Sequence, residues 1–114
     1  MSAQSIPLLT LTVVLAGTVA ANRFVTPAGA QAGVDANTLG VARTSGVSGE
    51  KVPVDVIGTA VVEAGAAIAL GATLESDASG RAVTWATAGG KVGIALQAAS
   101  GAGVFIEVLL LPNA

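Results

Sequence analysis

Apolar and polar residues alternate along several short stretches of the chain, most clearly near its C-terminal end. Residues 92–96 form a short apolar run, and a turn of small residues follows at 98–103. From residue 104 onward the chain alternates, with Val104, Ile106, Val108 and Leu110 on one face. Alternation with a period of two is typical of a half-buried β-strand. Residues 92–111 are therefore predicted to form a β-hairpin.

The same pattern occurs earlier, at residues 39–57. Gly40-Val41-Ala42 matches Gly93-Ile94-Ala95 with an offset of 53 residues, and residues 52–56 match residues 104–108 with an offset of 52. Asn22 corresponds to Gly71, and these two residue types most readily adopt a positive φ. We therefore predict two pseudo-symmetric strand-turn-hairpin repeats, at residues 17–58 and 66–111. The glycine that opens each hairpin is expected to mark a tight bend or a close backbone approach.

The N-terminal segment, residues 1–15, is predicted to be an extended arm or a first strand. Thr10 and Thr12 interrupt its apolar run at alternate positions, which would place Leu9, Leu11 and Val13 on one face. A secretory signal is the alternative, but residues 1–5 contain no Lys or Arg. The run is also far shorter than the about 20 residues of a membrane-spanning helix. We expect no membrane partner.

Glycine, proline and acidic residues predict the boundaries of the remaining strands. Pro53 lacks an N–H, so its strand is expected at a sheet edge or beside a bulge. Gly58 is expected to end that strand, and residues 59–63 to open the second half. Residues 77–80 predict a turn that Asp77 caps, and residues 89–90 predict a chain reversal. Together these features predict an all-β fold for residues 1–114, a single domain forming a small β-barrel or β-sandwich.

Composition limits the chemistry of the chain. It has no cysteine and no histidine, which excludes disulfides, thiol or imidazole nucleophiles and the usual zinc sites. The formal charge is −2 and the five basic residues are scattered, which argues against a nucleic-acid partner. Asp55 and Glu107 occupy equivalent repeat positions and are expected to face solvent rather than to act as a catalytic pair. We predict no enzymatic activity and no cofactor or metal.

The chain is unusually poor in charge, with 53% apolar and 11% charged residues. Because soluble domains typically carry about a quarter charged residues, part of its surface is expected to be covered by a partner. Trp85 is the single tryptophan. It is interpreted as an interface anchor, a stacking platform for a sugar, or a core residue. A secreted or surface β-module that binds carbohydrate through Trp85 is the alternative function.

Several short motifs then occur in an order that resembles the small capsid decoration (cement) proteins of tailed bacteriophages. The matching residues are Arg23-Phe24-Val25, Gly40-Val41-Ala42, Val62-Glu63-Ala64-Gly65, Ile68, Gly71, Leu74, Asp77, Gly80-Arg81-Ala82, Gly93-Ile94-Ala95-Leu96, Ala98-Ala99 and 104–111. One departure is Gly101-Ala102-Gly103, where the pattern would have Gly-Glu.

The resemblance implies a non-enzymatic structural protein of the virion. It implies binding to the major capsid protein on the capsid exterior, at the junctions between subunits, by a homotrimer made in the cytoplasm of the bacterial host. We expect the N-terminal arm, residues 2–15, to add a strand to a neighbouring subunit or to the shell. The expected interface residues are Ile6, Leu8, Leu9, Leu11, Val13 and Trp85.

Overall fold

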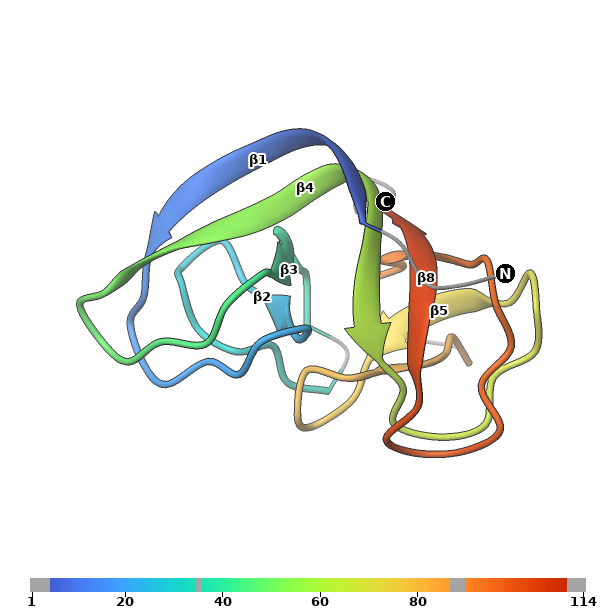
Figure 1. The fold of residues 1–114 in the computed structure, drawn as a ribbon. Helices are drawn as coiled ribbons and strands as arrows, with labels where there is room; N and C mark the ends of the chain where they lie inside the picture. Colours follow the sequence, from blue (N-terminus) through green and yellow to red (C-terminus); the bar gives the residue numbers. More distant parts are fainter. Residues whose placement is uncertain (1–4, 35, 87–89, 111–114) are drawn as a thin grey trace.

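The computed structural model describes residues 5–34, 36–86 and 90–110, and the regular structure within these ranges is β-strand (Figure 1). The all-β prediction is confirmed. The strands are β1 (Ile6–Val14), β2 (Phe24–Val25), β3 (Gly40–Ala42), β4 (Lys51–Glu63), β5 (Thr73–Ser76), β6 (Ala82–Thr84), β7 (Gly93–Ala95) and β8 (Phe105–Leu110).

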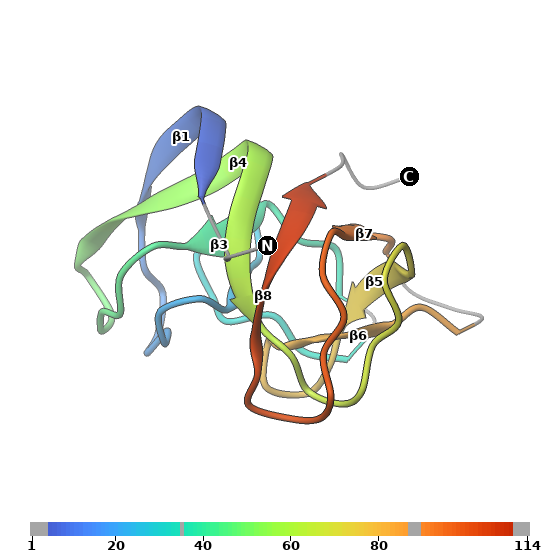
Figure 2. The ribbon, with the colours of Figure 1, turned by 45° about the vertical axis from the view of Figure 1, so that its right-hand side comes forward.

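The strands form one antiparallel sheet that curls until it is nearly closed into a small barrel (Figure 2). Their order is β2-β3-β4-β8-β7-β5-β6, and β1 pairs with β4 outside this path. The two ends of the sheet meet where Phe24 N donates to Gly80 O over 2.8 Å. Arg23 strengthens this closure, because its guanidinium contacts Glu63 at 3.0 Å and donates to Ser79 O at 2.9 Å.

β4 is the longest strand and connects the two hairpins. Its first part pairs with β1 and β3, and its second part pairs with β8. The prediction that Gly58 ends this strand is wrong, because β4 continues through it to Glu63. Gly58 has a φ of 110°, so the chain bends inside the strand instead of leaving the sheet (Figure 1). Residues 59–63, predicted to open the second half, belong to this same strand.

Pro53 does not lie at a sheet edge, so the prediction for this residue is also wrong. Thr12 of β1 lies opposite Pro53 on one side of β4. On the other side, the carbonyl of Pro53 accepts a hydrogen bond from Arg43 N at 3.0 Å. A register shift in β1 and β4 occurs opposite Leu9, not at the proline. The missing N–H of Pro53 explains why β3 ends at Ala42: the next residue pair cannot form its second ladder bond.

Two apolar clusters fill the interior. The larger one combines residues of both halves of the chain, among them Phe24, Val41, Leu74 and Val108. The smaller cluster lies within the first half and consists of Leu15, Val19, Val25, Ala42, Val52 and Val54. Burial of these side chains is the main favourable term in the folding of such a sheet.

Local turn chemistry follows the sequence closely. Asn22 and Gly71 have φ values of 62° and 85°, as their residue types predict. Asp77 Oδ1 accepts hydrogen bonds from Ser79 N at 2.8 Å and Arg81 N at 2.9 Å, so the predicted capped turn is confirmed. The predicted reversal at residues 89–90 begins at a residue outside the described ranges.

The two hairpins carry the same hydrogen bonds at matching positions. Asn22 N donates to Ala42 O, and Gly71 N donates to Ala95 O, both over 2.8 Å. Further matched pairs are Val19–Gly46 with Ile68–Ala99, Phe24–Val41 with Thr73–Ile94, and Leu11–Val54 with Ala60–Val108. The two-repeat organisation stays a prediction, which these matched pairs support. Two of the matched residues, Leu11 of β1 and Ala60 of β4, lie outside the ranges predicted for the repeats, 17–58 and 66–111.

The strand register corrects one part of the predicted repeat alignment. Ala42 pairs with Val54 in the first hairpin, and Ala95 pairs with Val108 in the second. Asp55 therefore corresponds to Leu109, not to Glu107. A shift of two residues leaves every side chain on the same face, so alternation in the sequence could not distinguish the two alignments.

The opening glycines of both hairpins lie directly against backbone, as predicted. A Cβ added at Gly40 would meet the carbonyl oxygen of Asp55, and one at Gly93 would meet that of Leu109. At Gly101, by contrast, an added Cβ meets no atom within 4 Å.

We therefore expect Gly93→Ala to lower the free energy of unfolding by about 1–3 kcal/mol, the usual cost of overpacking, because the β7–β8 backbones must separate. Gly101→Ala is the matched control and should change stability little. Urea unfolding of both variants measures the difference. Equal stabilities would show that the close approach at Gly93 does not constrain the sheet.

Candidate functional site

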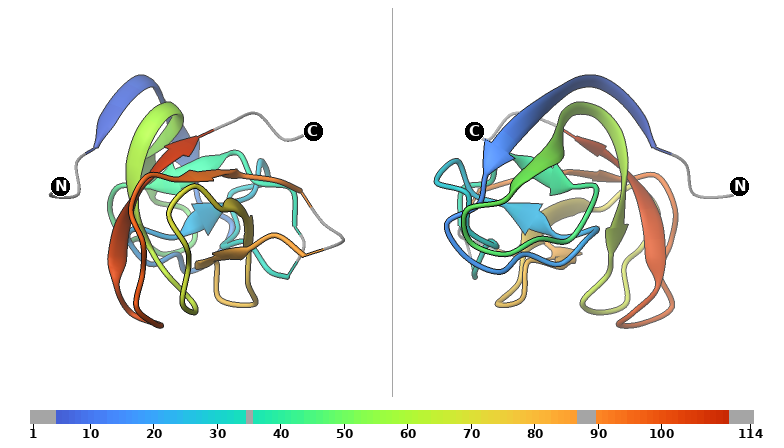
Figure 3. Two further views of the ribbon diagram at one scale, coloured as in Figure 1. Left: turned by 90° about the vertical axis from the view of Figure 1, so that its right-hand side faces the viewer. Right: turned by 60° about the vertical axis from the view of Figure 1, so that its left-hand side comes forward.

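β1 is the most exposed element of the fold. It arches along the outside of β4 (Figure 3), and none of its side chains is buried. Its exposed apolar residues are Ile6, Leu8, Leu9, Leu11 and Val14, and Leu8 is 79% exposed. Apolar side chains gathered on one exposed element indicate an interaction site more strongly than scattered ones do.

The structure separates the six expected interface residues into two places. Ile6, Leu8, Leu9 and Leu11 are exposed on β1, and Val13 is half-buried against the smaller apolar cluster. The sixth, Trp85, follows β6, which lies at the other end of the molecule from β1 (Figure 2).

Trp85 is half-buried rather than displayed. Its backbone N donates to Thr73 O at 2.8 Å, and Lys91 Nζ lies 4.6 Å from the ring centroid. The ammonium group therefore covers one face of the indole through a cation–π contact.

Two further exposed apolar residues lie on β1 or directly opposite it but were not predicted. Val14 ends β1, and Ile57 of β4 lies opposite Leu9. The apolar run of the sequence could have indicated Val14. Ile57 could not be assigned to this surface without knowing that β1 pairs with β4.

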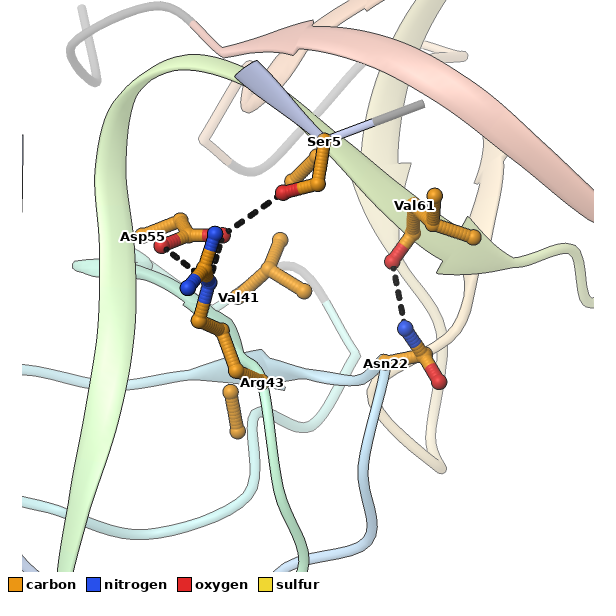
Figure 4. A pocket seen from close by; sticks show the side chains of 8 residues that line it. Ser5, Asn22, Val41, Arg43, Asp55 and Val61 are labelled. Atoms are coloured by element: carbon orange, nitrogen blue, oxygen red, sulfur yellow. Dashed lines mark hydrogen bonds and ion pairs between the residues drawn. The ribbon is translucent and has the colours of Figure 1, made fainter. Parts of the chain in front are cut away.

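Asp55 forms the polar centre of the contact between β1 and the rest of the sheet (Figure 4). Its carboxylate accepts hydrogen bonds from Ser5 Oγ at 3.1 Å, Thr10 Oγ1 at 2.9 Å and Arg43 Nε at 3.0 Å. We call these four residues the Asp55 cluster. Both hydroxyls come from β1 or the residue before it, so the cluster connects β1 to β4 through side chains as well as backbone.

The prediction that Asp55 and Glu107 face solvent is wrong, because they are only 1% and 4% exposed. β4 is paired on both sides at Asp55, and the hydroxyls of β1 replace the water that an exposed carboxylate would bind. The signal in the sequence is a single acid within the apolar strand 52–57. Its partners Ser5 and Thr10 lie 50 and 45 residues away, where no local pattern reveals them.

Three members of the Asp55 cluster, Ser5, Arg43 and Asp55, line a pocket of about 300 Å³ together with Asn22 and Val41. The guanidinium of Arg43 balances the charge of the carboxylate, and the side chain of Arg43 is half exposed. A carboxylate that is already neutralised and hydrogen-bonded by three donors is suited to holding β1 in place. Ser5 has no histidine beside it that could act as a general base and activate its hydroxyl as a nucleophile.

Among the described residues, no three acidic side chains group closely enough to hold a metal ion. Those residues also contain no helix that is long and apolar enough to cross a membrane.

Comparisons with known proteins agree with this fold. The chain is similar in structure to the head fiber gp8.5 N base of bacteriophage phi29, with a TM-score of 0.72 and 20% sequence identity over 90% of this chain and 93% of that one. At this identity the likeness shows the fold. No curated protein matches the chain. The family model for phage cement proteins matches residues 3–110. The chain therefore belongs to the phage cement protein family.

Proposed function

We propose that this protein binds the outside of a phage head at the junctions between capsid subunits and stabilises the shell. Its partners are the major capsid protein and other copies of itself, in a homotrimer on the virion exterior. Membership of the cement family supports a structural protein of the phage head. The exposed apolar residues on β1 are the observation that supports binding to the shell.

β1 offers the shell both side chains and backbone. Among the described residues it pairs only with β4, so its outer edge has no strand partner there. An apolar strand with an open edge readily accepts a strand from another chain. Residues 6–14 also carry no charge that would oppose such pairing. Strand addition and burial of Leu8 would together bind the shell.

The Asp55 cluster prepares β1 for this contact. By binding Ser5 and Thr10, Asp55 fixes the strand in one register before any partner arrives. A strand that is already ordered loses less conformational entropy on binding than a free arm does.

The proposed role is non-enzymatic, and the surroundings of Trp85 favour it over carbohydrate binding. A sugar that stacks on Trp85 would have to compete with Lys91 for the ring face that it covers. No feature of the described residues near Trp85 favours a sugar site over this contact.

Leu8→Asp is expected to weaken binding to empty heads by roughly 10- to 100-fold. Burial of a leucine side chain contributes about 1.5–3 kcal/mol, and each 1.4 kcal/mol is about tenfold in affinity. Cosedimentation of the purified protein with undecorated heads measures the effect.

Leu70→Asp is the matched control, because Leu70 is also highly exposed but lies outside β1. It should bind heads as the unmodified protein does. If both variants bind equally well, β1 is not the surface that contacts the shell.

Asp55→Asn tests whether the cluster holds β1. The amide replaces one acceptor oxygen with a donor, so at least one of the three donors loses its partner; a lost buried hydrogen bond costs about 1–3 kcal/mol. We expect faster hydrogen exchange of the β1 amides, followed by mass spectrometry. Glu50→Gln, at an exposed acid, should leave them unchanged. Unchanged exchange in Asp55→Asn would show that backbone pairing alone positions β1.

A further inference from the structure

β1 and the strand segment that corresponds to it in the second half differ greatly in how far their side chains are buried. The pairing of Leu11 with Val54 corresponds to that of Ala60 with Val108, so β1 occupies in the first half the place of residues 58–63 in the second. Ala60 is 1% exposed, whereas Leu11 is 39% exposed. The difference shows that the strand in the second half has a cover that β1 lacks.

That cover comes from the first half of the same chain. Ala60 belongs to the larger apolar cluster together with Phe24 of β2 and Val41 of β3. Val41 and Ala60 also line the same pocket, where Figure 4 shows Val41 beside Asp55 and Arg43. The face of the first half that carries Phe24 and Val41 therefore packs against the second half.

The second half carries a counterpart of this covering face. The pair Phe24–Val41 corresponds to Thr73–Ile94. Phe24 and Val41 are buried, but Thr73 and Ile94 are only half-buried, as is Leu109 opposite Ile94. A single chain thus has an exposed strand, β1, on which no apolar face packs. It also has an apolar face around Ile94 that is only partly buried.

We infer that a second copy of this chain completes both surfaces: the Ile94 face of one copy packs against Leu11 on β1 of the next. This contact between two chains would resemble the packing of Val41 and Ala60 in one apolar cluster within a single chain. Its two sides are apolar, so their burial on association is favourable. This inference rests on the self-association in the proposed function and assigns the surfaces that join the copies; it does not depend on binding to the shell.

The symmetry of the assembly follows from the two surfaces being different. A contact between unlike surfaces is head-to-tail, and such contacts close into a ring when the rotation between copies permits it. A ring of this kind leaves Leu8, at the bulge between Pro7 and Leu9, outside the contact between copies and available to the shell.

The test places opposite charges on the two surfaces. Leu11→Lys and Ile94→Asp should each raise the apparent dissociation constant of the assembly by about tenfold or more, as loss of a central apolar side chain does at other interfaces. In the double variant L11K/I94D every head-to-tail contact has one lysine facing one aspartate, and assembly should return. Light scattering after size-exclusion chromatography measures the mass at several concentrations.

Leu8→Asp and Leu70→Asp are the controls and should keep the mass of the unmodified protein. Thermal unfolding checks that each variant is folded. If a charged single variant is not folded, Leu11→Ala or Ile94→Ala replaces it and should also weaken assembly, whereas the rescue test uses L11K/I94D alone. Three results would overturn the inference: an unmodified protein that is monomeric at all concentrations, single variants that assemble normally, or a double variant that stays dissociated. Loss of head binding in Leu8→Asp with normal assembly would leave the inference intact, so its failure and that of the proposed function are distinguishable.

Discussion

The sheet depends on β4, which pairs with strands of both halves of the molecule. β1 and β3 flank its first part, and β8 pairs with its second part. A strand that serves two hairpins must change direction between them without losing its ladder bonds. Gly58 makes this possible: its positive φ bends the chain, and a Cβ there would meet the carbonyl of Ile6. Gly58 therefore allows both the bend in β4 and the close approach of β1 to it.

Local chemistry made much of the fold predictable. The alternation at residues 52–56 and 104–108 predicted both hairpins, and the φ of Asn22 and the capped turn of Asp77 follow from residue type alone. The continuation of β4 through Gly58 was not predictable, because glycine ends strands as readily as it bends them. The exposed residues of β1 were predictable from their apolar run. The burial of Asp55 was not, because its partners lie far away in the sequence.

Three of the acidic residues are buried, which lowers the number of charged groups on the surface. Asp55, Glu75 and Glu107 are buried, so their charges add little to the polarity of the surface. The remaining surface is even poorer in charge than the composition suggests. Such a surface gives little electrostatic guidance to a partner, and its association depends on fitted apolar contacts. This agrees with the proposal that its partners are a capsid lattice and its own copies.

The attachment of β1 also determines how the molecule would carry a mechanical load. Leu15, directly after β1, is buried and bonded to Gly49 and Glu50, so the strand ends at a fixed point. A force along β1 therefore acts on all of its ladder bonds with β4 at the same time. A force perpendicular to it would open them one after another. If β1 binds the shell as proposed, a load directed along the strand is therefore the one that its attachment to β4 resists best.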